Sequence, residues 1–393
     1  MVSKGVIDAE TGKAVVLNKG EVVIPERIIW NEKEYVVISI GEAAFFRTSI
    51  TDVTIPDTVT RIGNGAFALC DSLAGPLELP EKITYIGDAA FEMCKNLQGE
   101  LKLPEGLEYL GYASFHKCEK LVGDVVIPSK ITIIRESAFS GCVGLNGRLV
   151  LPEGITKIEL SAFYQCERLK GELKLPESLQ TIETSAFAGT GFSGSLNLPK
   201  NLYSINFNAF SGCSGFSGNL IIPDTVKYLG GSAFSGCSGF NGTLYISESL
   251  EEIKTSTFEK CSGLKGTLKI PESVKKIGMS AFSGCEGFSG KLEVPGNVET
   301  IENYAFSDCR FTDILLAEGV RRVGAYTFFG NKAGGGTISI PSTLETIGGR
   351  AFAEPAVTYQ SVNIAQPKGS IDILNAGILD AVANDESRIH WLG

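Results

Sequence analysis

The sequence predicts a repeat solenoid, in which short coils of chain stack on one another through parallel strands. Three observations support this prediction. A motif of about 24 residues recurs along most of the 393-residue chain. One phenylalanine keeps its place in every copy, at steps of 22, 23 or 24 residues. A unit this short cannot bury its apolar side chains alone, whereas stacked units cover one another.

The repeated motif is L-x-L-P-E-x-L-x-x-I-G-x-x-A-F-x-x-C-x-x-L-x-G-x. Its conserved spacing predicts fourteen coils, each with its phenylalanine in the coil interior. The anchoring phenylalanines are Phe45, Phe67, Phe91, Phe115, Phe139, Phe163, Phe187, Phe210, Phe234, Phe258, Phe282, Phe306, Phe328 and Phe352.

Each segment of the motif predicts one element of a coil. The L-x-L segment has the period of a strand and ends at proline, which lacks an amide donor; Ser247 and Ala317 replace that proline in two coils. A second, shorter strand is expected three to six residues after the proline, as at Ile83 and Ile86. The A-F-x-x-C segment predicts a turn of helix. The glycine of L-x-G predicts a turn that needs either a positive φ or a tight stack.

The two ends of the chain depart from the motif. Residues 1–46 are predicted to form an N-terminal cap and first coil with a hairpin at Asn31-Glu32-Lys33, and residues 47–352 the solenoid. Residues 353–393 are predicted to form a C-terminal cap, because a terminal repeat leaves its core open. This cap would hold a strand at 357–364, a short helix at 376–385 and a last strand at 389–392. The alternative is that residues 353–393 begin another domain.

All the cysteines stand three residues after the repeat phenylalanine. No C-x-x-C pair occurs, and zinc sites need such close pairs. The ladder falls into two runs of five, so complete disulfide pairing is impossible within a run. We expect free, buried thiols that act as small apolar side chains. The ten are Cys70, Cys94, Cys118, Cys142, Cys166, Cys213, Cys237, Cys261, Cys285 and Cys309.

Charge and motif content exclude several classes of function. The net charge of −10 argues against nucleic acid as a partner. No apolar run approaches the ~20 residues of a membrane span, so no membrane insertion is expected within this chain. The two histidines, His116 and His390, stand in no G-x-S-x-G, H-E-x-x-H or phosphate-loop motif. We therefore expect no enzyme activity, no catalytic residue, no metal and no cofactor.

An acidic residue follows the proline position in most coils. An evenly spread row predicts a solvated edge, and weak divalent-cation binding is the alternative. The row consists of Glu26, Asp57, Glu81, Glu105, Glu153, Glu177, Asp224, Glu248, Glu272 and Glu318.

The middle residue of each L-x-L strand should point outward. In two places, neighbouring coils carry apolar residues at this position, which indicates a protein-binding face. The alternative is ordinary β propensity on a solvated sheet. The candidate ligand-binding residues are the apolar pairs Val126 with Val150 and Ile221 with Tyr245, together with the flanking Lys102, Lys174 and Lys269. A second candidate patch on the short strands is Tyr85, Tyr109 and Ile133.

The repeat resembles the BspA-like leucine-rich repeats over residues 22–352. One coil matches the family's unit position by position, at Ile270-Pro271, Val274, Ile277-Gly278, Ala281-Phe282 and Cys285. The resemblance implies a right-handed leucine-rich-repeat coil with a parallel sheet, short second strands and short helical turns. It also implies a monomeric bacterial protein, extracellular or at the cell surface, that adheres to a host-matrix or microbial surface protein. Carbohydrate capture and a structural spacer role are the alternatives, and no binding residue is implied by the family.

Overall fold

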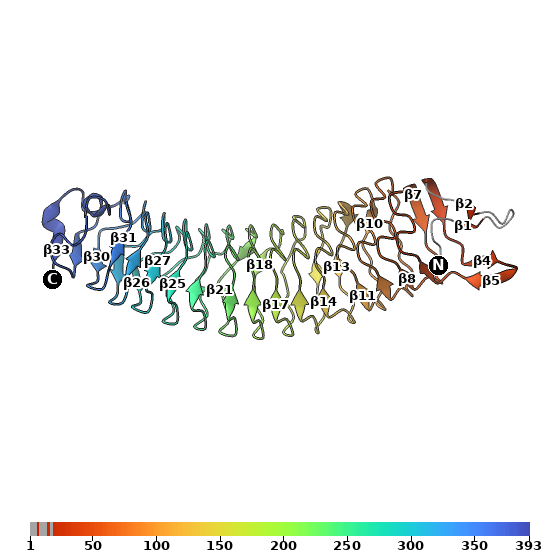
Figure 1. The fold of residues 1–393 in the computed structure, drawn as a ribbon, viewed down its shortest axis with the longest axis horizontal. Helices are drawn as coiled ribbons and strands as arrows, with labels where there is room; N and C mark the ends of the chain where they lie inside the picture. The colour runs from red at the N-terminus through yellow and green to blue at the C-terminus, as the bar shows by residue number, and fades with distance from the viewer. Residues whose placement is uncertain (1–5, 8–13, 16–18) are drawn as a thin grey trace. The chain divides into compact units, whose positions relative to one another are not determined.

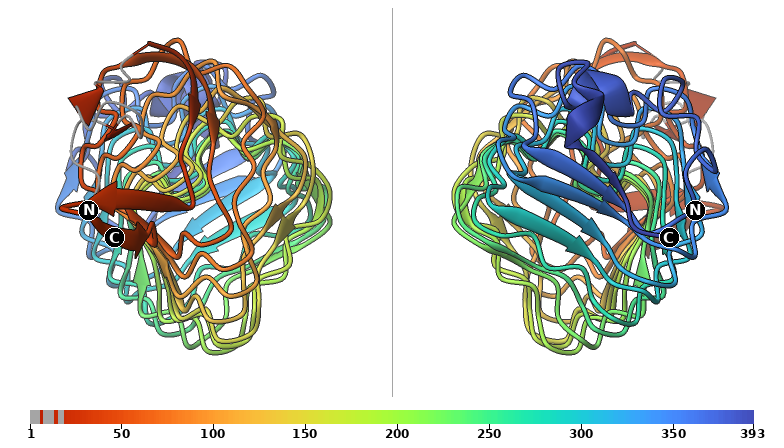
Figure 2. Two further views of the ribbon diagram at one scale, coloured as in Figure 1. Left: turned by 90° about the vertical axis from the view of Figure 1, so that its right-hand side faces the viewer. Right: turned by 90° about the vertical axis from the view of Figure 1, so that its left-hand side faces the viewer.

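The computed structural model describes residues 6–7, 14–15 and 19–393. The chain forms two compact units, Met1–Phe192 and Ser193–Gly393. Each unit is a stack of coils joined by parallel strands (Figure 1). Figure 2 shows that a coil runs once around an interior, with strands on two of its sides and turns between them. This architecture confirms the predicted parallel-strand solenoid.

In the first unit, the second strand of each coil forms the longer sheets. This confirms the predicted second strand, although Ile83 lies before it, because the Ile83 amide closes a turn onto the Pro80 carbonyl oxygen at 3.1 Å. One parallel sheet contains β6 (Ser39–Ile40), β8 (Arg61–Ile62), β9 (Tyr85–Ile86) and β11 (Tyr109–Leu110). Another contains β14 (Ile133–Ile134), β16 (Lys157–Ile158) and β17 (Thr181–Ile182).

The L-x-L side of the first unit has shorter ladders. At 101–103, where the motif predicts a strand, the chain lies outside any strand. The residues that pair with the next coil are instead those of the preceding glycine turn, 98–100. The paired strands are β3 (Lys19–Val23) with β7 (Ser49–Thr54), β10 (Gln98–Glu100) with β12 (Lys120–Val122), and β13 (Val125–Val126) with β15 (Leu149–Val150).

The second unit repeats this arrangement with longer sheets toward its end. The L-x-L sheet is β26 (Lys291–Val294), β28 (Asp313–Leu316), β30 (Thr337–Ile340), β32 (Ser361–Ile364) and β33 (Ile389–Trp391). The short-strand sheet is β24 (Glu252–Ile253), β25 (Lys276–Ile277), β27 (Thr300–Ile301), β29 (Arg322–Val323) and β31 (Thr346–Ile347). The remaining pairs are β18 (Gly194–Ser195) with β20 (Phe216–Ser217), β19 (Ser204–Ile205) with β22 (Tyr228–Leu229), and β21 (Leu220–Ile221) with β23 (Leu244–Tyr245).

The A-F-x-x-C side differs from the expected helical turn. The residue before the Ala-Phe pair has a positive φ, 52° at Ala89, which interrupts a right-handed helix. The chain instead forms three-residue turns that bond to the next coil: the Phe91 amide donates to the Ser114 carbonyl oxygen at 2.8 Å. Alternate amides on this side therefore join neighbouring coils. Among the described residues, the α-helix is confined to α1 (Ile378–Ala381).

The repeat phenylalanines form the core of each unit. Their rings stack with centroids 5.1–5.9 Å apart from Phe45 to Phe187, and 5.0–6.0 Å apart from Phe210 to Phe352. Fully buried aromatic rings in offset stacks contribute both apolar burial and ring contacts. The predicted interior position of these phenylalanines is confirmed.

The cysteines lie beside this phenylalanine stack, and all ten are free and buried, as predicted. Nine of the thiols donate to the phenylalanine carbonyl of the preceding coil, and the bond from Cys94 Sγ to the Phe67 oxygen is 3.0 Å. Thr48 occupies the equivalent position of the first coil and donates to the Phe45 oxygen at 2.8 Å. In the coils from Phe45 to Phe306 the position therefore takes cysteine or threonine, a small side chain with one donor.

Both expected reasons for the turn glycines are present. Gly99 has φ 94°, a region that favours glycine. Gly147 has no positive φ, but a Cβ there would collide with Asp124 Oδ1 of the preceding coil.

The ends of the chain contain the expected elements. The hairpin is β4 (Arg27–Trp30) with β5 (Lys33–Val36), and its turn residues Asn31 and Glu32 have φ values of 50° and 61°. Two positive φ values are typical of the tight turn that matches strand twist. A further antiparallel pair is β1 (Val6–Ile7) with β2 (Ala14–Val15).

At the C-terminal end, β32 and β33 extend the L-x-L sheet although the motif has ended. The expected helix at 376–385 is shorter, because Ala383 and Asn384 have positive φ. A 3₁₀ helix, η1 (Glu386–Arg388), precedes the last strand. The cap boundaries at residues 46 and 352 stay predictions.

Candidate binding surfaces

In each unit, the outward residues of the L-x-L segments form what we call its strand face. All of them are exposed except Leu315 and Ser339, which are half-buried. They are Glu78, Lys102, Val126, Val150 and Lys174 in the first unit, and Asn197, Ile221, Tyr245, Lys269, Glu293, Leu315 and Ser339 in the second.

The first apolar pair lies side by side on β13 and β15. Val126 pairs with Val150 in register, and each side chain is 43% exposed. The preceding residues, Val125 and Leu149, are buried, so the strand alternates as predicted. Lys102 lies one coil earlier, and its Nζ forms an exposed ion pair with Glu100 at 3.5 Å.

The second apolar pair lies on β21 and β23. Ile221 pairs with Tyr245, and their exposures are 53% and 39%. The Tyr245 hydroxyl donates to Asp224 Oδ2 at 3.1 Å, which fixes the orientation of its ring. Desolvation, followed by the Asp224 carboxylate, raises the pKa of Tyr245. One coil later, Glu248 lies 2.9 Å from Lys269 Nζ and raises the pKa of that ammonium.

The candidate patch on the short strands is enclosed between two arginines. The rings of Tyr85 and Tyr109 stack at 4.6 Å, with Arg61 3.8 Å from the Tyr85 centroid and Arg135 4.8 Å from the Tyr109 centroid. Because both outer ring faces are covered, the stack offers edges rather than an open aromatic platform. Ile133 is half-buried in β14. Burial, with help from the Asp88 carboxylate, raises the pKa of Tyr109 to about 12.

The acidic row binds the turns of neighbouring coils. Asp224 Oδ1 accepts the Glu248 amide at 2.8 Å, and Glu318 accepts the amide and hydroxyl of Ser342 at 2.9 and 2.8 Å. These bonds lower the pKa of the Glu318 carboxyl. Within the ranges that the structure describes, no three His, Cys, Asp or Glu side chains gather to hold a metal ion.

The two histidines lie in unrelated surroundings. His116 is half-buried, and desolvation lowers its pKa; its Nδ1 is buried and has no hydrogen-bond partner among the described residues. His390 lies exposed on β33.

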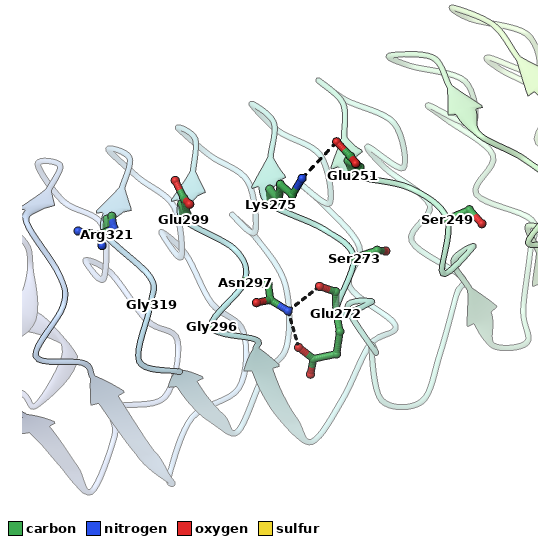
Figure 3. A pocket seen from close by; sticks show the side chains of 10 residues that line it. All are labelled: Ser249, Glu251, Glu272, Ser273, Lys275, Gly296, Asn297, Glu299, Gly319 and Arg321. Carbon is green, nitrogen blue, oxygen red and sulfur yellow. Dashed lines mark hydrogen bonds and ion pairs between the residues drawn. The ribbon is translucent and has the colours of Figure 1, made fainter.

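A groove in the second unit was not predicted from the sequence. Its volume is about 620 Å³, and it crosses the turns that join the L-x-L strands to the short strands (Figure 3). The sequence feature that could have indicated this groove is a break in the acidic row. Gly296 stands where other coils carry the acidic residue, and in the next coil glycine follows the acidic residue, at Gly319. The lining residues are Ser249, Glu251, Glu272, Ser273, Lys275, Gly296, Asn297, Glu299, Gly319 and Arg321.

Three exposed aromatic residues were also missed. Tyr203 is 58% exposed, Phe207 50% and Tyr228 41%, with Lys254 Nζ 4.0 Å from the Tyr228 ring centroid. The signal was three aromatic residues at outward positions of two successive coils.

No helix in the described part of the chain combines the length and apolar character that a membrane span requires. Short coils with two strands, stacked turns and an aliphatic-phenylalanine core define a leucine-rich-repeat solenoid. Within that class, the chain belongs to the BspA type leucine rich repeat region family, whose model matches residues 31–146, 147–265 and 264–373. Leucine-rich repeats of this kind are generally non-enzymatic binding scaffolds.

Solved structures of bacterial repeat proteins are similar to this chain. A leucine-rich repeat protein from Bacteroides ovatus is 27% identical with a TM-score of 0.65, covering 87% of this chain and 92% of that one. A leucine rich cell surface protein from Faecalibacterium prausnitzii is 26% identical with a TM-score of 0.52, covering 79% of this chain and 88% of that one. Comparison with curated proteins gives no match.

Proposed function

We propose that this chain is a non-enzymatic, monomeric adhesion module at the cell surface, and that its strand face binds a protein ligand. Two observations support a surface location: membership of the BspA-type family and the likeness to a protein described as a leucine rich cell surface protein. The ligand would be a host-matrix or microbial surface protein.

The observation that carries the proposal is the pairing of exposed apolar side chains in register. Val126 with Val150, and Ile221 with Tyr245, each place two such side chains side by side on a regular sheet. Binding energy in protein interfaces concentrates in a few apolar and aromatic anchors surrounded by polar groups. Tyr245 suits this role, because its hydroxyl is already bonded to Asp224 and its orientation is fixed before binding.

The test is adhesion of the purified chain to immobilised matrix proteins, namely collagen, laminin and fibronectin. A variant with all four anchors changed should lose binding at least tenfold, because burying such side chains contributes about 1.5–3 kcal/mol each. The variant carries Val126→Ser, Val150→Ser, Ile221→Ser and Tyr245→Ser.

The matched control changes the same residue types at exposed positions away from the strand face. It carries Val143→Ser, Val357→Ser, Ile29→Ser and Tyr164→Ser, and it should bind as the parent does. Equal binding by the parent and the four-anchor variant would reject the strand face. If the purified chain binds none of these proteins, the structural spacer role replaces adhesion as the proposed function.

A further inference from the structure

The groove of the second unit lies where two neighbouring coils carry the lining glycines Gly296 and Gly319. A Cβ at Gly296 would collide with the Glu318 carbonyl oxygen, and a Cβ at Gly319 would collide with the Gly296 carbonyl oxygen. The two coils therefore pack backbone against backbone at this point. At Gly296 the acidic row therefore has no side chain.

The walls of the groove are polar and carry both signs of charge. On one wall, Asn297 Nδ2 donates to the Glu272 carbonyl oxygen at 2.8 Å and to Glu272 Oε2 at 3.2 Å (Figure 3). The other wall is a row, one residue per coil, that alternates in sign. It consists of Glu251, Lys275, Glu299 and Arg321.

Three members of this row are already paired, and one is not. Glu251 lies 3.4 Å from Lys275, and Arg321 lies 2.6 Å from Glu345. Glu299 is exposed and forms no ion pair with any residue that the structure describes. One carboxylate is thus available between two cationic side chains.

A hydroxyl in the groove lacks the partners that its counterparts have. At the same position of other coils, Ser178 Oγ accepts the Gly154 amide at 2.9 Å, and Thr343 Oγ1 accepts the Gly319 amide at 2.8 Å. Ser273 Oγ is buried without a hydrogen-bond partner in the described structure. Buried polar atoms in native proteins are nearly always satisfied, so an orphaned one needs an explanation.

The cause lies one coil earlier. Ser247 stands where most coils have proline, and its Oγ accepts the Ser249 amide at 3.2 Å. The Ser249 amide is the donor that Ser273 would otherwise use, by analogy with Gly154 and Ser178. A single proline-to-serine departure from the motif therefore leaves the buried hydroxyl of Ser273, a residue that lines the groove, without its usual donor.

We propose that this groove binds a short neutral saccharide. Sugar hydroxyls donate and accept at once, as serine hydroxyls do, and so match a wall on which donors and acceptors alternate. The volume of about 620 Å³ lies within the ~300–1,000 Å³ of small-molecule sites. No lining residue is apolar or aromatic, which disfavours an apolar peptide anchor. A basic peptide would meet Lys275 and Arg321, and an acidic one Glu251, Glu272 and Glu299.

The experiment titrates the whole chain with four probes, maltotriose, cellotriose, chitotriose and mannotriose, by calorimetry. At least one should bind with a dissociation constant below about 10 mM. Glu299→Gln should weaken that binding about tenfold, because it removes a charged acceptor. Ser273→Ala should weaken it about threefold while leaving the thermal midpoint equal or higher, since no native hydrogen bond is lost.

Ser178→Ala is the matched control, because it removes a hydroxyl at the same motif position in the first unit. It should lower the thermal midpoint and leave saccharide binding unchanged. Glu293→Gln repeats the charge change on the strand face, outside the groove, and should also bind normally.

Three results would overturn the proposal: no binding by any of the four probes, binding that Glu299→Gln and Ser273→Ala leave intact, or binding of trilysine in place of every saccharide. The four-anchor variant of the strand face should keep its saccharide binding. The saccharide proposal for the groove and the proposal that the strand face binds protein can thus be rejected independently.

Discussion

The phenylalanine stack predicts a large and local loss of stability when one ring is removed. Phe139 is fully buried, with ring centroids 5.9 Å from Phe115 and 5.3 Å from Phe163. Phe139→Ala should destabilise its part of the chain by about 3–5 kcal/mol, from lost burial and the cavity left behind. Two ring contacts of about 0.5–1.5 kcal/mol each lie within that sum.

The loss should be confined to nearby coils, because in a repeat stack each coil contacts only its neighbours. Hydrogen–deuterium exchange with mass spectrometry resolves this: amides of residues 115–187 should exchange faster, and those of the second unit should not. Phe207→Ala is the control, because that ring is 50% exposed, and it should change urea stability by less than about 1 kcal/mol. A Phe139→Ala chain that loses under 1 kcal/mol, or that exchanges faster throughout, would refute a locally coupled core.

Three further predictions concern side chains whose surroundings are defined above. The thiols should resist alkylation in the native protein because all ten are buried, and at Cys142 burial also raises the pKa to about 12; all ten should react after denaturation. Arg61→Ala should lower stability by about 0.5–2 kcal/mol by uncovering the Tyr85 ring, as measured by urea unfolding. The Ser342 bonds lower the pKa of Glu318, so its contribution is present above the ordinary value of 4.5 and is lost as the pH falls through the folded-state value. Glu318→Gln should therefore flatten the acid limb of the stability–pH curve.

The sequence predicts well those features of the fold that depend on one type of side chain recurring at the same position of every coil. Phe91 and its equivalents must fill the same interior position, so their spacing defines the coil. Alternation along a strand likewise places Val126 outward and Val125 inward. The expected helical turn was not formed, because Ala89 and its equivalents adopt a positive φ, and residues such as alanine and serine give no sign of that conformation.

The groove could not be predicted from the repeat motif, for a different reason. It lies where Gly296 and Gly319 bring two coils into backbone contact, and where Ser247 rather than Ser273 accepts the Ser249 amide. Neither effect is a property of one residue. Each depends on which coil lies next to which, and that pairing is known only once the coils are stacked.

The uniform phenylalanine position also bears on how such a chain changes length. Phe115 and Phe163 offer the same ring geometry to whatever coil lies beside them. Deleting one full repeat between them would bring together two coils whose packing surfaces match. Duplicating a repeat would lengthen the stack through the same ring contacts that the other coils make. Recombination within the gene could in this way lengthen or shorten the exposed surface of the stack by whole coils, with no change to the residues that pack in the interior.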